Sequence, residues 1–106
     1  MHLVTAEPVL HPRHEFDDLL NSPTRLSILA ALSRLEDVEF AALRDSLEVS
    51  DSVLSKQATL LEAAGYVRIR KGHVGKRPRT WLAMSADGRR AFSRHVAALH
   101  AVLGDA

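Results

Sequence analysis

Cysteine is absent from the 106 residues, which excludes disulfide bonds and thiolate metal sites and is typical of proteins in a reducing cytoplasm. The chain also lacks any apolar run close to the roughly 20 residues that a membrane-spanning helix needs. Its first residues do not follow the basic and then apolar order of a signal peptide. We therefore expect a cytoplasmic protein without a membrane partner.

Catalytic signatures are missing as well. The sequence contains no G-x-S-x-G elbow, no phosphate-binding glycine loop and no H-E-x-x-H pair, so we expect no enzyme and no cofactor. Six histidines raise the question of a metal. His95 and His100 are five residues apart, which fits one helical face poorly, so we expect solvated histidines. A metal site shared across a dimer is the alternative.

Charge is unevenly distributed along the chain. The hydrophobic fraction of 46% is ordinary for one small globular domain. The net charge is only +1, yet residues 1–66 carry five Lys and Arg against eleven Asp and Glu. Residues 67–106 carry nine basic residues against two acidic ones. A strongly positive end favours a polyanion as binding partner.

The amino-terminal part predicts an arm followed by helices. Residues 1–15 contain scattered histidines and two prolines and predict a flexible, extended arm. Residues 16–21 predict a short helix. Ser22 followed by Pro23 is suited to begin the next helix, whose apolar residues continue to about Leu35.

The next segment predicts two helices joined by a tight turn. Residues 38–40 predict a very short strand, and residues 41–47 predict a two-turn helix with Leu43 and Leu47 pointing inward. Residues 48–50 form the turn to the following helix. This is the layout of a helix-turn-helix, although many unrelated helix pairs share it.

The helix after this turn is the centre of the chain. Leu54, Ala58 and Leu61 recur at steps of four and three, which places them on one buried face. Ser50 can cap the first turn by accepting a hydrogen bond from an orphaned backbone N–H. Gly65 can adopt the left-handed conformation that ends a helix.

The opposite face of this helix predicts DNA contact. It carries hydroxyls, an amide and one cation, without a carboxylate between Asp51 and Glu62, whereas a solvated face usually mixes Glu with Lys. Lysine suits guanine acceptors or phosphate, and glutamine can pair bidentately with adenine or pack under the hairpin that follows. The candidate DNA-binding residues are Ser52, Ser55, Lys56, Gln57 and Thr59.

A basic β-hairpin follows. Apolar residues alternate with arginines over residues 66–70, residues 71–78 predict a turn, and residues 80–84 predict the return strand. Six of the twelve positions from Arg68 to Arg79 are Lys or Arg, and none is acidic. This charge predicts phosphate contact, with an arginine reaching into a minor groove. The candidate DNA-binding residues here are Lys71, His73, Lys76, Arg77 and Arg79.

The last helix predicts self-association. Ser85 can cap it, and apolar residues then recur at steps of four, three and four over about four turns. A domain this small cannot easily cover so long a stripe, so we expect it to pack against a second copy; docking on its own monomer is the alternative. The candidate interface residues are Phe92, Val96, Leu99, Val102 and Leu103.

Together these elements resemble a winged helix-turn-helix transcriptional regulator, most of all the small regulators of the MarR and ArsR groups. The matching blocks are SPTRLSILAAL at 22–32, FAALRDSLEVSDSVLSK at 40–56, LEAAGYVRIRKG at 61–72 and GKRPRTWLAMSADGR at 75–89. The fold that this implies is mainly α with a small β-hairpin (α+β). We expect the domain over residues 16–106, with residues 85–104 as a C-terminal dimerisation helix.

The resemblance implies a homodimeric regulator, expected to be a repressor, on a pseudo-palindromic operator in double-stranded DNA. Each central helix would enter a major groove as the recognition helix, and each hairpin would touch the flanking minor groove or backbone. Two residues depart from the pattern: Ala58 stands where a larger aliphatic residue is common, and Leu60 where a charged residue is common. Leu60 could touch a thymine methyl group, a partner subunit or nothing.

Two other functions remain open. Winged helices also bind proteins or RNA, because a fold alone does not fix a function. A metal- or small-molecule-responsive repressor is the second alternative, although nothing in the sequence marks an effector pocket.

Overall fold

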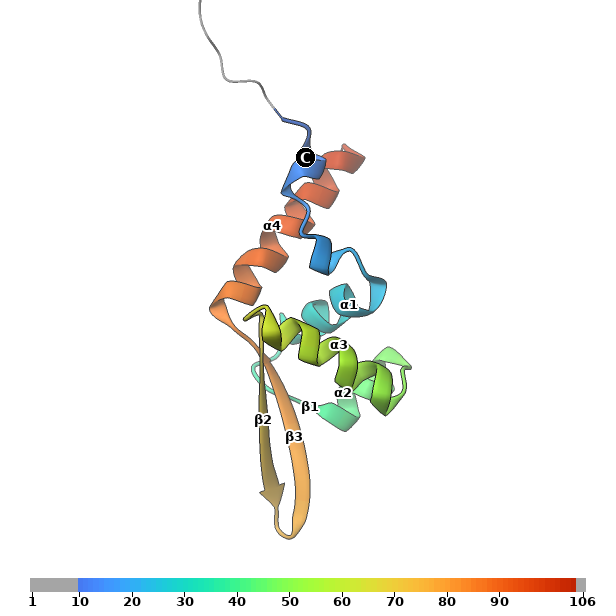
Figure 1. The fold of residues 1–106 in the computed structure, drawn as a ribbon, viewed down its shortest axis with the longest axis vertical. Helices are drawn as coiled ribbons and strands as arrows, with labels where there is room; N and C mark the ends of the chain where they lie inside the picture. Colours follow the sequence, from blue (N-terminus) through green and yellow to red (C-terminus); the bar gives the residue numbers. More distant parts are fainter. Residues whose placement is uncertain (1–9, 105–106) are drawn as a thin grey trace, which may run out of the picture.

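The computed structural model describes residues 10–104 and is mainly helical with one small sheet (Figure 1). The three strands are antiparallel in the order β1-β3-β2, which confirms the predicted α+β class. The elements are η1 (Pro12–Glu15), η2 (Asp18–Leu20), α1 (Pro23–Leu32), β1 (Val38–Glu39), α2 (Phe40–Leu47), α3 (Asp51–Ala63), β2 (Val67–Val74), β3 (Arg77–Met84) and α4 (Ala86–Leu103), where η denotes a 3-10 helix.

Aliphatic side chains from η2, the first three α-helices and the sheet make the core. Each is at most 2% exposed, and burying one fully stabilises the fold by about 1.5–3 kcal/mol relative to leaving it in water. The core side chains in this class are Leu20, Ile28, Leu29, Leu32, Leu43, Leu54, Leu61, Val67 and Leu82. The helices α1, α2 and α3 therefore cover one face of the sheet.

Helix α1 begins as predicted but ends earlier. The Ser22 hydroxyl accepts a hydrogen bond from the backbone N–H of Arg25 at 3.2 Å, ahead of Pro23 at the first helical position. The predicted continuation to Leu35 is wrong, since the helix stops at Leu32 and Leu35 is 59% exposed. The chain has to turn there, because Val38 pairs with Leu82 in the sheet.

The hairpin is longer than predicted. The predicted turn over residues 71–78 is mostly strand, because β2 and β3 stay in register out to the pair Val74 and Arg77. Only Gly75 and Lys76 remain in the turn. A two-residue turn favours a positive φ at its first position, and Gly75 supplies 63°.

Helix α4 starts directly at the base of the hairpin, and Ser85 is the joint. Its hydroxyl accepts from the N–H of Gly88 at 2.9 Å, and it donates to the carbonyl of Gly65 at 2.5 Å. A Cβ atom at Gly88 would lie 2.1 Å from the carbonyl oxygen of Tyr66, so only glycine fits at this crossing. From this joint, α4 and the hairpin extend away from the helices in opposite directions (Figure 1).

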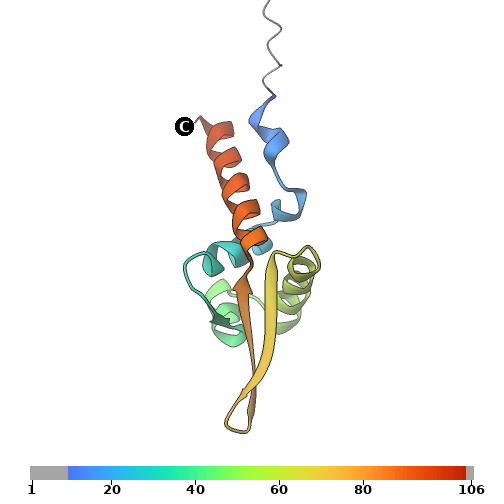
Figure 2. The same ribbon diagram turned by 90° about the vertical axis from the view of Figure 1, so that its left-hand side faces the viewer.

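The amino-terminal segment lies beside α4 in both views (Figures 1 and 2). Residues 1–9 of the predicted arm lie outside the described residues. The described end of the arm is not extended: Pro12–Glu15 form η1, whose Pro12 is partly buried. The predicted short helix over residues 16–21 is a single 3-10 turn, η2.

Candidate nucleic-acid interface

Helix α3 is fixed to the domain by the face that the sequence predicted. Leu54, Ala58 and Leu61 are at most 1% exposed. The Ser50 hydroxyl accepts from the N–H of Val53 at 3.2 Å, and Gly65 adopts a φ of 81° after the last turn. The position of the outward face is therefore set by core packing within one chain.

The outward face of α3 has two rows of side chains. The row nearest the hairpin, here called the groove row, consists of Ser55, Thr59 and Glu62. The row on the far side, here called the outer row, consists of Val53, Lys56 and Leu60. Residues spaced i, i+3 or i+4, and i+7 stand one above the other on a helix, which is why each set forms a row.

Ion pairs secure the turn between α2 and α3. Arg44 donates to the carboxylates of Asp45 at 2.9 Å and Asp51 at 2.8 Å. These hydrogen bonds raise the pKa of Arg44, and the bond from Arg44 lowers the pKa of Asp45. Asp51 lies in the first turn of α3, and its pairing with Arg44 partly neutralises a charge that would repel phosphates.

The two faces of the hairpin carry different cations. Lys71 and His73 share the face toward α3 with Ile69, because every second strand residue points to the same side. Arg68 and Arg70 lie on the other face. There the Arg70 guanidinium stands 4.3 Å from the centroid of the Trp81 ring, a cation–π contact across the register pair. Trp81 thus packs within the hairpin.

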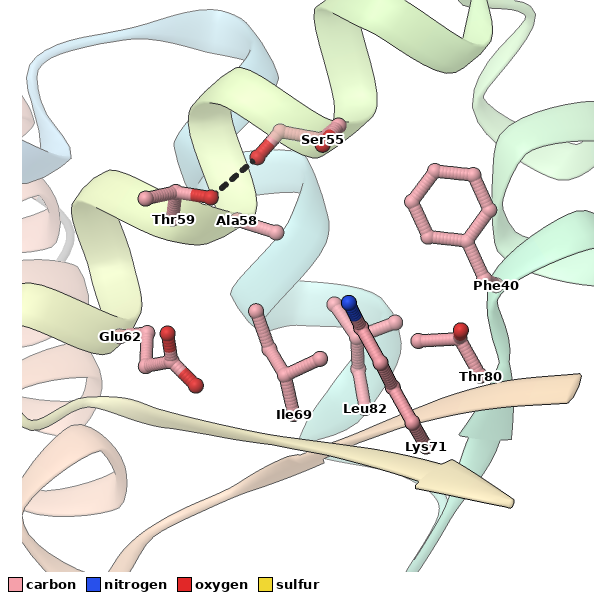
Figure 3. A pocket seen from close by; sticks show the side chains of 9 residues that line it. All are labelled: Phe40, Ser55, Ala58, Thr59, Glu62, Ile69, Lys71, Thr80 and Leu82. Carbon is pink, nitrogen blue, oxygen red and sulfur yellow. Dashed lines mark hydrogen bonds between the residues drawn. The ribbon is translucent and has the colours of Figure 1, made fainter.

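A groove separates α3 from the hairpin (Figure 3). Its volume is about 580 Å³, and its apolar lining consists of Phe40, Ala58, Ile69 and Leu82. Polar groups line it as well: the groove row of α3, with Lys71 and Thr80 of the hairpin. Figure 3 shows Lys71 reaching up from the strand toward α3. The hydroxyls of α3 and a cation of the hairpin therefore lie on the same side of the molecule.

Helix α4 packs against the rest of the domain through a narrow face. His95 and Ala98 are buried, and Phe92, Val96 and Leu99 are half-buried. Near the end, Val102 is 42% and Leu103 is 75% exposed. The apolar stripe predicted from the sequence is thus only partly covered within one chain.

Comparison with known proteins decides the family. A family model described as a winged helix DNA-binding domain matches residues 24–103. The chain belongs to this family. The winged helix protein is therefore a DNA-binding regulator of a non-enzymatic family, which confirms the resemblance predicted from the sequence.

Similar proteins agree with this assignment. The winged helix protein is 33% identical over 78 residues to the uncharacterized protein MJ0432 of Methanocaldococcus jannaschii, covering 74% of this chain and 85% of that relative. The solved transcriptional regulator homologue of Pyrococcus horikoshii OT3 is 27% identical with a TM-score of 0.76, covering 81% of this chain and 85% of that one. A MarR-family regulator of Silicibacter pomeroyi is 25% identical with a TM-score of 0.65, covering 88% and 62%.

The predicted hydroxyl residues of the winged helix protein differ in what they can offer. Thr59 donates to the carbonyl oxygen of Ser55 at 2.8 Å, so its oxygen is left to accept (Figure 3). Ser52 shares a hydrogen bond of 3.1 Å with Ser50, while the Ser55 hydroxyl lines the groove. Lys56 is exposed in the outer row.

Gln57 is turned away from the hairpin and toward α1. Arg25 donates from Nη1 to the Gln57 carbonyl oxygen at 2.6 Å and from Nε to the carbonyl of Leu19 at 2.5 Å. A bidentate contact with adenine needs that same oxygen. In this arrangement one of the two lone pairs of that oxygen is already used, and Gln57 ties α3 to α1. Packing under the hairpin, the other role considered for Gln57, is not what the structure has.

The hairpin cations are not equivalent. Arg79 is half-buried and forms an ion pair with Glu39 of β1. Lys76 and Arg77 are exposed at the tip, and within residues 10–104 neither has a salt bridge. Lys71 is likewise exposed and has no salt bridge within these residues, so Arg79 alone of the predicted hairpin lysines and arginines is held by an acidic partner there.

One histidine contradicts the expectation that all are solvated. His95 is 1% exposed, and its Nδ1 accepts from the backbone N–H of Asp17 at 3.1 Å. The Asp17 carboxylate accepts from the hydroxyl of Tyr66 at 2.5 Å and from the N–H of Leu19 at 3.0 Å. Burial lowers the pKa of His95, although the nearby Asp17 charge acts in the opposite sense.

This cluster also perturbs Tyr66, because the hydrogen bond to Asp17 raises the pKa of the phenol. His95, Asp17 and Tyr66 join α4, the amino-terminal segment and the base of the hairpin. The sequence of no single element predicts this cluster. The one local signal is that His95 lies on the apolar face of its helix. Sequence reasoning likewise missed Arg25 and Glu39, which hold two of the predicted contact residues.

Two further searches concern the described part of the chain alone. None of its helices is both long and apolar enough to cross a membrane. Between residues 10 and 104, no three His, Asp or Glu side chains come together as a set that could hold a metal ion.

Proposed function

We propose that two copies of this winged helix protein pair through α4 and bind a pseudo-palindromic operator, where they repress transcription. The observation that carries this proposal is the shared groove: the hydroxyls of α3 and the Lys71 ammonium border one hollow. A single straight duplex can therefore meet helix and hairpin together. The pairing of the copies and the sense of regulation go beyond family membership.

The dimensions of α3 support its placement in a major groove. An α-helix with its side chains is about 10–12 Å across, which matches a B-DNA major groove about 12 Å wide, and the 13 residues of α3 extend for about 20 Å along it. Ser52 and Lys56 would face the base edges or the groove walls. The hairpin then lies over the adjoining backbone, where Lys76 and Arg77 neutralise phosphates and release counterions.

Two features of α4 support pairing with a second copy. In its last turn Val102 and Leu103 are exposed to water, so these apolar side chains do not contribute the stabilisation that burial would give. The described part of the amino-terminal segment, from residue 10 on, lies against the side of α4 that holds His95 and Ala98. A second α4 packed on the remaining apolar side would complete the cover and relate the two copies by a two-fold axis.

Such a dimer predicts the form of its binding site. With a two-fold axis, the half-sites are inverted repeats whose centres lie about 34–36 Å apart, one turn of the double helix. Repression follows from occupancy of promoter DNA that the polymerase needs.

Selection from random duplex DNA with the purified full chain tests binding and symmetry together. We expect an enriched inverted repeat. The mass of its complex in light scattering should correspond to two copies of the protein per duplex. An excess of structured RNA should not compete. Enrichment of no duplex sequence, or preferential competition by RNA, would contradict the proposal and favour an RNA-binding or protein-binding module.

Transcription in vitro tests the sense of regulation. The selected site, placed across a promoter, should give less transcript as the protein is added, while a scrambled site gives no change. More transcript would show that the protein activates.

A further inference from the structure

The outer row of α3 contains two apolar side chains on a surface that is otherwise polar. Val53 is 41% and Leu60 is 40% exposed, and Lys56 stands between them. The buried face of α3 already supplies its contact with the core, so the fold does not need these two residues. A surface that complements this row would have apolar groups next to negative charge or hydrogen-bond acceptors.

From this row we infer that Val53 and Leu60 read thymine methyl groups in the major groove on either side of Lys56. This inference rests on the proposed operator binding. The 5-methyl group of thymine is the one apolar group that base edges present in that groove. Lys56 between the two supplies the charge that a guanine edge or a phosphate requires.

The spacing of the row fits two bases within one half-site. Val53 and Leu60 are seven residues apart, about 10.5 Å along the helix axis at about 1.5 Å per residue. Base pairs are stacked about 3.4 Å apart, so the two contacted thymines should lie about three base pairs from each other.

A second copy is a weaker candidate for covering this row. The apolar end of α4, with Val102 and Leu103, points away from α3 (Figure 1). The outer row also lies beside Ser52, on the face without carboxylates. Another protein that covered this row would have to supply an acidic partner for Lys56, because burying an unpaired charge is costly.

The test replaces each thymine of the selected operator, one at a time, by deoxyuridine. This change removes a methyl group and leaves every charge in place, so the phosphate contribution is constant at fixed salt. We expect two sensitive positions per half-site, each weakening binding about fourfold, the value of about 0.8 kcal/mol for one buried methyl-sized group. Fluorescence anisotropy with the full chain measures the effect.

Variants then assign each position. Leu60→Ala should lose the response to deoxyuridine at one position and Val53→Ala at the other, and alanine retains the helix because it is the best helix former. Leu35→Ala removes an exposed leucine from the loop after α1, away from α3, and should keep both responses. The two-by-two comparison of protein and DNA changes isolates the contact.

The outcomes separate this inference from the proposed function. An operator that is bound equally well with uracil at every position overturns the inference and leaves operator binding intact. Uracil effects that persist in both alanine variants overturn it too, as does a change of dimer mass in Leu60→Ala. If no duplex sequence is selected, both proposals fail.

Discussion

Helices α3 and α4 both leave one face in water, but the two faces differ in kind. The face of α3 carries hydroxyls, a lysine and two isolated aliphatic side chains, and its position is set entirely by burial of Leu54 and Leu61 within the chain. The face of α4 is aliphatic toward its end, and no residue between 10 and 104 covers Val102 or Leu103. A single copy can present α3, whereas the exposed end of α4 is the surface through which we propose that a second copy pairs.

The comparison separates affinity from assembly. Charge on the α3 side acts through counterion release and falls with salt, while apolar burial on the α4 side does not. Changes on the α3 side should therefore alter the salt dependence of binding, and changes on the α4 side should alter the mass of the assembly.

The largest effect is expected from a charge at the end of α4. Leu103→Glu should give monomers and weaken operator binding about 100-fold or more, because two linked half-sites bind far more tightly than one. Leu103 is 75% exposed, so the monomer fold is unaffected. Light scattering and anisotropy measure the two results.

The matched control is Ala101→Glu, which places the same charge in the same turn on the other side of α4. It should remain dimeric. Leu103→Glu that keeps the dimer mass, or Ala101→Glu that loses it, would show that the apolar stripe is not the interface.

The next effect concerns the free cations of the hairpin. Replacing Lys76 and Arg77 together with alanine should weaken binding to all DNA sequences about tenfold or more. The slope of log affinity against log salt should fall by about 3.6, that is about 0.9 for each of the four phosphate contacts that a dimer loses. A salt titration of the double variant against wild type gives both numbers.

Arg79→Ala sharpens the same measurement. Since Glu39 already holds Arg79, its removal should leave the slope nearly unchanged. A fall in slope equal to that of a tip residue would mean that Arg79 leaves Glu39 to contact the duplex.

A smaller effect is expected from pH, through His95. A buried neutral histidine with a lowered pKa binds fewer protons in the folded state than in the unfolded one. Its stabilising contribution is therefore present above the ordinary pKa of about 6.5 and is lost as the pH falls below that value. Thermal unfolding between pH 7.5 and 5.5 should show the loss.

His95→Asn keeps an acceptor for the Asp17 N–H but cannot titrate, so its unfolding temperature should fall less over this range than that of the wild type. His100→Asn, at an exposed position on the same helix, should follow the wild type. Parallel curves for all three proteins would exclude His95 as the source.

The smallest effect is a gain in stability at the turn before α3. Glu48 has a φ of 56°, a left-handed conformation that costs a side-chain-bearing residue about 1 kcal/mol. After the entropy lost by glycine, Glu48→Gly should gain about 0.5 kcal/mol, or about 2–4 °C in unfolding temperature. Glu36→Gly, in a loop without positive φ, should instead lose stability.

The sequence predicted what neighbouring residues decide among themselves. Serine caps at Ser22, Ser50 and Ser85 are all present, because a cap needs only a hydroxyl and an N–H three residues ahead. The buried face of α3 was predicted from the helical spacing of its apolar residues alone. The clustering of Lys and Arg likewise predicted the cations of the hairpin. The predicted length of the turn between the strands was too large.

What the sequence could not predict depends on distant partners. Gln57 faces Arg25, 32 positions away, and Arg79 faces Glu39, 40 positions away, so neither pairing leaves a local pattern. His95 is buried because Phe16 packs on its ring, with centroids 5.2 Å apart, which no periodicity in α4 reveals. Whether the candidate residues contact DNA stays a prediction.

The single residue between β3 and α4 has a mechanical meaning. Ser85 donates a hydrogen bond to the Gly65 carbonyl and caps α4, so we expect β3 and α4 to move together as one unit about the contact between Gly88 and Tyr66. In the proposed pair, any twist of the two long helices against each other swings both hairpin tips through a wide arc. A small rearrangement far from the nucleic acid thereby becomes a large displacement at its surface.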